Sequence, residues 1–177
     1  MVSSLFSSGT SFIKLVADPN DQLPAITYWL MGSLSGTKGA DVKFAIIPML
    51  IGIIPLILIS WQINILTVGE EEAKTMGINT KLIRFVTIIC ATLLTSASVA
   101  VSGMIGWIGL VIPHLSRRLV GNNFVYLLPT SAIFGASFLL LGDNVSRNLW
   151  TSEIPIGILT SFIGVPFFIY LITRRGD

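Results

Sequence analysis

Two long uncharged segments constrain the fold of this chain more than any other feature of its sequence. Residues 44–61 and 85–113 contain no Asp, Glu, Lys or Arg. A membrane-spanning helix needs about 20 predominantly apolar residues, and its backbone groups must find their hydrogen-bond partners within the helix. Charged residues make up only 11% of the whole chain, against roughly 25% in soluble domains. The sequence therefore predicts an all-α, polytopic bundle of transmembrane helices.

Between these two segments lies the densest charge cluster of the chain, at residues 69–82. It must lie in water, because unpaired charges are costly in hydrocarbon. Glu70 and Lys74 are four residues apart with the acid first, the order that favours a helix, and Gly77 is typical of a helix end. We expect a short surface helix that ends at Gly77. Two interpretations stay open: a docking site for a soluble partner, and a solvated turn.

The rest of the chain is expected to supply about five full spans, a partial first helix and a short interfacial helix. The N-terminal segment is similar to the second half of a helix, so the chain is expected to be a fragment. The break at 102–106 is interpreted as a tight re-entry between two helices. The expected elements are a partial helix at 1–18, a turn at 18–22, an interfacial helix at 23–34, a Gly-rich loop at 35–43, and spans at 44–61, 85–102, 106–118, 127–150 and 156–173.

Small residues around the break at 102–106 suggest close helix packing. Ser96, Ala100 and Gly103 are expected to share one face of the helix before the break, and Gly106 and Gly109 the face of the helix after it. The alternative is that membrane helices simply contain more Gly and Ser. This second helix is expected to end in the run from Pro113 to Arg118. His114 is interpreted as a helix-end residue, with gating as the alternative.

Basic residues predict the orientation, because cytoplasmic loops are enriched in Lys and Arg. Threading the spans alternately places seven basic residues on the side of the 69–84 loop and three on the other side. The first group is Lys74, Lys81, Arg84, Arg117, Arg118, Arg174 and Arg175, and the second is Lys38, Lys43 and Arg147. The charged loop is therefore expected to be cytoplasmic.

Residues that could carry catalysis are scarce. The chain has one cysteine and one histidine, and no paired acids, metal-ligand spacing or nucleophile–base pair occurs. Asp143 and Arg147 are four apart on one helix, which predicts an intrahelical ion pair; the alternative is that Arg147 docks an acidic partner. We therefore expect no enzyme, no catalytic residue, no metal and no cofactor. A net charge of +2 also gives no reason to expect nucleic acid as a partner.

Several spans with small-residue faces, a broken helix and a cytoplasmic helix that ends at a glycine are typical of a transporter subunit. The sequence contains no Walker A motif, so such a subunit would receive its energy through the cytoplasmic loop. Five blocks in order then resemble one known family, the ABC importer permeases for iron–siderophore, haem and cobalamin (FecCD/BtuC-like). The blocks are 29–34 (WLMGSL), 69–77 (GEEEAKTMG), 102–118 (SGMIGWIGLVIPHLSRR), 127–147 (from LLP to GDNVSR) and 154–170 (IPIGILTSFIGVPFFIY). Together they cover essentially the whole chain.

The resemblance implies a fold and site residues. Members have ten spans and form a dimer around a central path, and residues 1–177 are similar to roughly their second half, a single permease domain. The loop at about 64–84 would dock in the ATPase through Glu70, Glu71, Glu72, Ala73, Lys74 and Gly77. Arg147 would dock the substrate-binding protein. The expected helix-packing or gating residues are Gly103, Gly106, Gly109, Pro113 and His114.

The function implied is that of a permease subunit in the cytoplasmic (inner) membrane of a prokaryote. It would move a metal chelate, with iron–siderophore first and haem, cobalamin or molybdate as alternatives. Its expected partners are ATPase subunits, a periplasmic or lipid-anchored substrate-binding protein, a second permease chain or a separate N-terminal half, and membrane lipid. The alternative function is a truncated, nontransporting membrane scaffold or a pseudogene-like remnant of such a permease.

Overall fold

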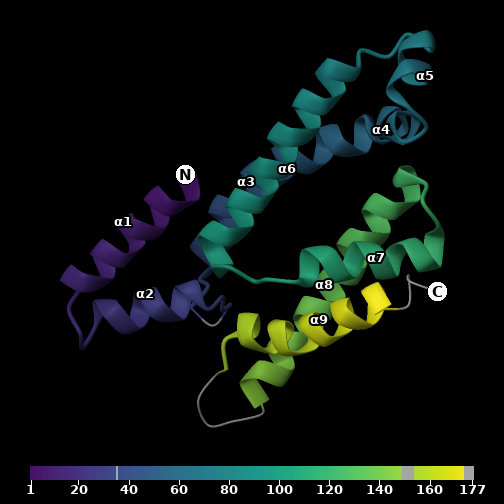
Figure 1. Cartoon of the computed structure of the whole chain (residues 1–177). Helices are drawn as coiled ribbons and strands as arrows, with labels where there is room; N and C mark the ends of the chain where they lie inside the picture. The colour runs from purple at the N-terminus through teal and green to yellow at the C-terminus, as the bar shows by residue number, and fades with distance from the viewer. Residues whose placement is uncertain (35, 149–153, 174–177) are drawn as a thin grey trace.

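The computed structural model describes residues 1–34, 36–148 and 154–173, and the regular elements in these residues are α-helices (Figure 1). This confirms the predicted all-α fold. The helices are α1 (Val2–Val16), α2 (Gln22–Leu30), α3 (Gly39–Leu58), α4 (Ser60–Leu66), α5 (Glu70–Thr75), α6 (Thr80–Ser102), α7 (Ile108–Val120), α8 (Phe124–Asn148) and α9 (Ile156–Thr173).

Within the described residues, three helices are long and apolar enough to cross a membrane: α3, α6 and α8. The helix α7 has 13 residues, or about 20 Å at 1.5 Å per residue, which is shorter than a hydrocarbon core of about 30 Å. The predicted count of five spans therefore stays a prediction.

The helices α3 and α6 lie side by side (Figure 1). The residues that α6 buries include Ile83, Cys90 and Ala97, which recur every seven residues and so share one face. Opposite them, α3 buries Gly52, where an added Cβ would lie 2.8 Å from Leu94 Cγ. The missing side chain lets the two backbones approach closely, as in other membrane helix pairs.

Within the described residues, this contact uses another face of α6 than the predicted one, and packing through Ser96 and Ala100 stays a prediction. Ser96 and Ala100 are exposed, whereas Ala97 between them is buried. A run of small residues is compatible with several faces, and only the position of α3 selects the one that packs.

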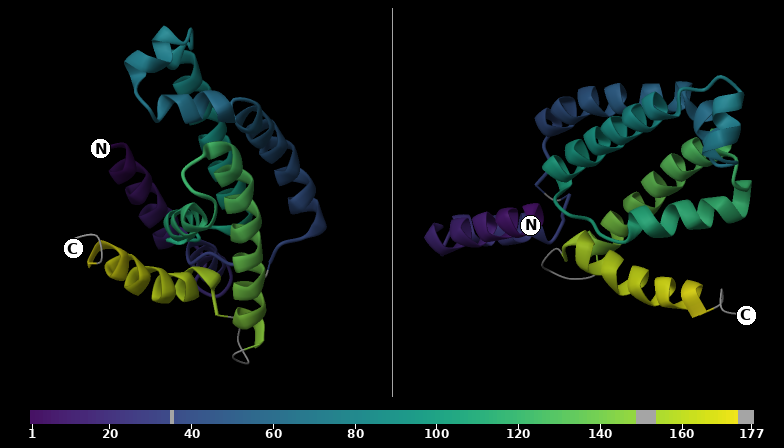
Figure 2. Two further views of the ribbon diagram at one scale, coloured as in Figure 1. Left: turned by 90° about the vertical axis from the view of Figure 1, so that its right-hand side faces the viewer. Right: turned by 45° about the horizontal axis from the view of Figure 1, so that its top comes forward.

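The helices α7, α8 and α9 form a second group (Figure 2). Trp107 precedes α7 and packs on α9: its ring lies 5.9 Å from that of Phe168, and an added Cβ at Gly164 would lie 2.5 Å from Trp107 Cβ. Trp107 has a φ of +66°, a conformation that is costly for a bulky residue. The packing against α9 holds this backbone conformation in place.

The helix α4 connects the two groups. It packs on α8, and the Phe124 N–H donates to Asn64 Oδ1 over 3.3 Å. The α7–α8 turn therefore lies at the same end of the bundle as α5, as Figure 2 shows. The alternation of ends that we expected from the sequence agrees with this arrangement.

Several predicted boundaries are wrong. The segment 35–43 is not all loop, because α3 begins at Gly39, where the Asp41 carboxylate accepts the Lys38 N–H over 2.8 Å and so satisfies a free donor of the first turn. The segment 44–61 is not one helix: α3 ends at Leu58 and α4 begins at Ser60. The interfacial helix α2 ends at Leu30, before the predicted 34.

The prediction of His114 as a helix-end residue is also wrong. Pro113 and His114 lie inside α7, which continues to Val120. The proline is the sixth residue of the helix, and it forgoes a hydrogen bond to a carbonyl of the first turns without ending the helix. The break at 102–106 is confirmed, since α6 ends at Ser102 and α7 begins at Ile108.

Candidate functional site

The loop that contains α5 is the candidate site at one end of the bundle. Three acidic residues occupy the first turn of α5, namely Glu70, Glu71 and Glu72, where the helix dipole favours negative charge. Ala73 is fully buried. The predicted helix and its position in the chain are confirmed.

The predicted stop at Gly77 is confirmed in detail. Gly77 has a φ of +78°, its N–H donates to Lys74 O over 2.9 Å, and the Ile78 N–H donates to Ala73 O over 3.0 Å. These two bonds form the Schellman arrangement, which needs a left-handed residue at the position of Gly77. The turn fixes the direction in which the chain leaves α5 and enters α6.

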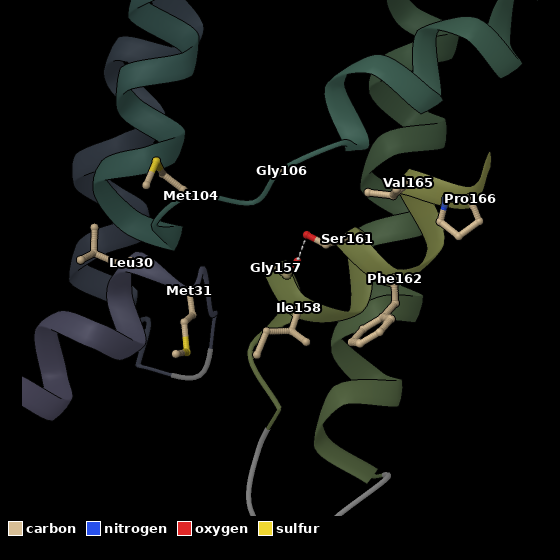
Figure 3. A pocket seen from close by; sticks show the side chains of 10 residues that line it. All are labelled: Leu30, Met31, Met104, Gly106, Gly157, Ile158, Ser161, Phe162, Val165 and Pro166. Atoms are coloured by element: carbon tan, nitrogen blue, oxygen red, sulfur yellow. Dashed lines mark hydrogen bonds between the residues drawn. The ribbon is translucent and has the colours of Figure 1, made fainter. Parts of the chain in front are cut away.

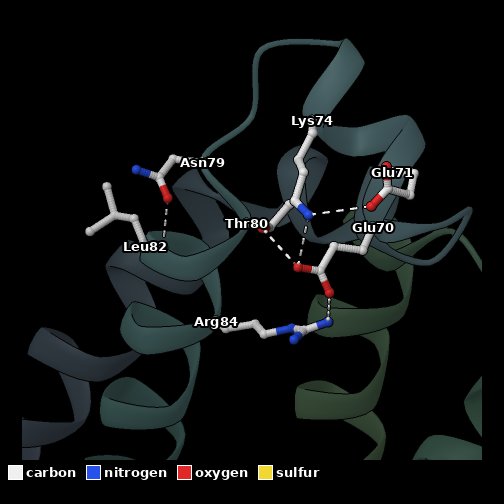
Figure 4. Close-up of polar contacts among 7 residues, drawn as sticks. All are labelled: Glu70, Glu71, Lys74, Asn79, Thr80, Leu82 and Arg84. Atoms are coloured by element: carbon white, nitrogen blue, oxygen red, sulfur yellow. Dashed lines mark hydrogen bonds and ion pairs between the residues drawn. The ribbon is translucent and has the colours of Figure 1, made fainter.

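Glu70 is the centre of the polar contacts at this site (Figure 4). Arg84 Nη2 lies 2.8 Å from Glu70 Oε2. Thr80 Oγ1 donates to Glu70 Oε1 over 3.3 Å, and Lys74 Nζ lies 3.6 Å from the same oxygen. The predicted pair of Glu70 with Lys74 is therefore present, but the shorter contact is made with Arg84, a residue of α6.

These cations change the acidity of Glu70. The Arg84 guanidinium, followed by the Lys74 ammonium, holds the pKa of the Glu70 carboxyl below its ordinary value of 4.5. A carboxyl whose pKa is lowered by folding stabilises the folded arrangement above its ordinary pKa. That contribution is lost as the pH falls through the lowered pKa.

We expect the α5–α6 junction to loosen in acid. Hydrogen exchange at α5, corrected for the intrinsic effect of pH, should accelerate as the pH is lowered from 6 to below about 4, because protonated Glu70 loses its attraction to Arg84. The Glu70→Gln variant should exchange at a rate that changes little over the same range. An equal acid response in both proteins would contradict this assignment.

The other two acids of α5 are exposed to solvent. The Glu71 side chain is 89% exposed, and its contact is an ion pair of 3.5 Å with Lys74. Glu72 is also exposed, and its carboxylate folds back over Gly69. The site thus presents two solvated carboxylates on a helix whose direction is fixed by its buried neighbours.

Glycines build a tight junction at the opposite end of the bundle. Cβ atoms added at Gly103 and Gly157 would overlap the carbonyl oxygens of Trp29 and Met31 respectively. The Gly157 N–H also donates to Gly32 O over 3.1 Å. Three segments distant in sequence, around residues 32, 103 and 157, therefore meet through their backbones.

An open apolar pocket of about 670 Å³ adjoins this junction (Figure 3). It lies between the end of α2, the 103–107 linker and the first turns of α9. Its lining residues are Leu30, Met31, Met104, Gly106, Gly157, Ile158, Ser161, Phe162, Val165 and Pro166. The Ser161 hydroxyl donates to Gly157 O over 2.7 Å, so the pocket offers a mainly apolar surface.

The remaining predicted residues are spread over the chain. Arg147 Nε lies 2.8 Å from Asp143 Oδ2, which confirms the predicted intrahelical pair. Gly103 packs as described, whereas an added Cβ at Gly106 or Gly109 would meet nothing within 4 Å. Packing through these two glycines has no partner in the described part of the chain and stays a prediction, as does gating by His114.

Sequence reasoning missed Arg84 and Thr80 as partners of Glu70, and Gly32 and Gly157 in the glycine junction. Local pairing rules reach only three or four residues along a helix, whereas Arg84 is 14 residues from Glu70. Among the described residues, no group of three His, Cys, Asp or Glu side chains could hold a metal ion.

The described part of the chain is thus all-helical, with membrane-length helices and an exposed helix–turn loop at one end. Residues 1–174 match the FecCD transport family. The chain belongs to this family.

Named relatives are similar over almost the whole chain. The molybdate import system permease protein MolB of Haemophilus influenzae is 42% identical over 99% of this chain and 53% of its own length. A probable iron chelatin transport system permease protein of Helicobacter pylori is 40% identical over 98% of this chain and 53% of its own length. The cobalamin import system permease protein BtuC of Halobacterium salinarum is 38% identical over 98% of this chain and 46% of its own length.

A solved structure described as an inward-facing conformation of a metal-chelate type ABC transporter has the same fold. It superposes with a TM-score of 0.89 at 42% identity, over 97% of this chain and 56% of the other. The chain thus spans about half the length of the relatives it matches. These curated relatives are named as transport permeases.

Proposed function

We propose that this chain is a permease subunit of a binding-protein-dependent ABC importer, energised by a separate ATPase that docks on α5. The observation that carries the proposal is the pair of exposed acidic side chains, Glu71 and Glu72, on a short helix of fixed direction. The family assignment supports it. A partner that moves α5 would also move α4 and α6, because short turns join them.

The proposed substrate is a metal chelate, with an iron chelate of the siderophore type first. Relatives are named for iron chelatin, cobalamin and molybdate, so haem, cobalamin or molybdate remain alternatives within one proposal. The apolar pocket beside the glycine junction supports a bulky substrate that is not held by charge.

The proposed orientation places α5 in the cytoplasm and the glycine junction on the outer face of a prokaryotic inner membrane. The substrate-binding protein would then meet the outer end of α8. Arg147 is 43% exposed there, and an acidic group of the binding protein could compete with Asp143 for it. A second permease chain would complete the path.

Mass spectrometry of the proteins that co-purify with the tagged chain from its native membrane tests this proposal. We expect a P-loop ATPase, a substrate-binding protein and a chain that supplies further membrane helices. In the same experiment, Arg147→Glu should reduce the recovered binding protein and leave the ATPase unchanged. Recovery of the chain without any ATPase would contradict the proposal and favour the nontransporting scaffold.

A further inference from the structure

Glu70 differs from the other two acids of α5 in what it touches. Its carboxylate contacts Arg84 at 2.8 Å and Thr80 at 3.3 Å, and both residues belong to α6. Thr80 is buried and Arg84 lies one turn later, so the two contacts fall on one face of α6. Glu71, in contrast, forms its ion pair with Lys74 of its own helix.

The helix α5 depends on contacts of this kind. It has six residues, less than two turns, and a helix of this length is not stable alone in water. Ala73 buries a single methyl group, and the Schellman bonds fix only the exit of the chain. The side-chain bonds that leave α5 for another helix, within the described residues, are those of Glu70 with α6.

We propose that Glu70 is a positioning residue, which fastens α5 to the first turns of α6 through Arg84 and Thr80. The proposal rests on the proposed function and takes Glu70 out of the docking set expected from the sequence, because its carboxylate is engaged by Arg84 and Thr80. Glu71 and Glu72 meet the ATPase, whereas Glu70 transmits the resulting motion to α6. A single exposed ion pair stabilises little, but this one joins α5 directly to α6, whereas other contacts of α5 are made with α4.

The contact with α6 is significant because α6 is one of the membrane-length helices among the described residues. Its far end reaches Gly103, whose backbone touches Trp29. A displacement of α5 that Glu70 passes to α6 would therefore act on the glycine junction, at the opposite end of the bundle. The helix α6 would in this way link α5 to the glycine junction through rigid contacts, without a flexible segment.

Hydrogen exchange of the chain in nanodiscs, without the ATPase, tests the link itself. Glu70→Gln and Arg84→Gln should each raise exchange at α5 by about two- to fivefold. The double variant should exchange no faster than the faster single variant, because the two residues act through one contact. Arg84→Lys should restore part of the protection, and Lys81→Gln, an exposed cation in the same turn of α6, should have no effect. Additive single effects would overturn the link.

The same variants in the complex with the ATPase test the positioning role. Glu70→Gln should retain the ATPase at the level of the unchanged protein, but the change in α6 exchange on adding a non-hydrolysable ATP analogue should fall at least about threefold. Loss of the ATPase would instead assign Glu70 to docking and overturn the positioning role, while the proposed function would stand. An unchanged nucleotide response would also overturn it. Failure of the proposed function is separate, because the unchanged chain would then recover no ATPase.

Discussion

Replacing Gly103 by Ala is expected to destabilise the chain by about 3 kcal/mol or more, one of the largest effects of any single methyl group in this protein. Two costs combine at this position. Gly103 has a φ of +67°, and an added Cβ would overlap the carbonyl oxygen of Trp29. The first cost is about 1–3 kcal/mol, because this φ occurs with a ψ of −164°, a combination that is essentially restricted to glycine. The second requires a backbone segment to move.

Two other glycines provide matched controls. Gly121 has nearly the same φ and ψ, +78° and −165°, with open space around it, so Gly121→Ala should show the conformational cost alone, about 1–3 kcal/mol. Gly106 has neither a positive φ nor a neighbour within 4 Å, so Gly106→Ala should change the stability by less than about 0.5 kcal/mol.

The free energy of unfolding can be measured by SDS titration of the chain in micelles, followed by circular dichroism. The expected order of destabilisation is Gly103→Ala, then Gly121→Ala, then Gly106→Ala. Equal effects at residues 103 and 121 would show that the Trp29 carbonyl exerts no steric pressure, and the tight junction would then be wrong.

Much of the fold follows from local patterns in the sequence. The length of the uncharged segments predicts the membrane helices. The helix α9 begins and ends at the predicted residues 156 and 173. Glycine readily adopts a left-handed conformation, which predicts that α5 ends at Gly77. A separation of four residues along a helix predicts the ion pair of Asp143 with Arg147. Each of these features is decided within a few residues of chain.

The features that sequence missed depend on which segments meet in space. The packed face of α6 runs through Ala97 and not through Ser96, because α3 lies on that side. The glycine junction joins residues more than 50 positions apart, such as Gly32 and Gly157. Arg84 can contact Glu70 because the turn at Gly77 lies between α5 and α6 and brings the two helices together. Glycine at the ends of helices was the available signal for the junction.

Reversing the charges of Glu71 and Glu72 is expected to have the largest effect on assembly. With both residues changed to Lys, the exposed face of α5 becomes positive, and a basic surface on a partner that meets it would be repelled. We expect the recovery of the ATPase to fall at least about tenfold. The fold should persist, because these side chains are exposed and the contacts of Glu70 with α6 remain.

Asp21→Lys is a control for the change of charge. Asp21 is an exposed acid that precedes α2 and makes no side-chain capping bond, and α2 ends beside the glycine junction, at the end of the bundle away from α5. This variant should retain the ATPase. Resistance to alkaline carbonate extraction should be the same for all three proteins and would show that membrane insertion is unchanged.

The most direct test of the account is therefore the amount of ATPase that co-purifies with three tagged chains: the unchanged protein, Glu71→Lys/Glu72→Lys, and Asp21→Lys. The account predicts full recovery with the first and third and loss with the second. Equal recovery with the unchanged chain and the double variant would contradict docking through α5.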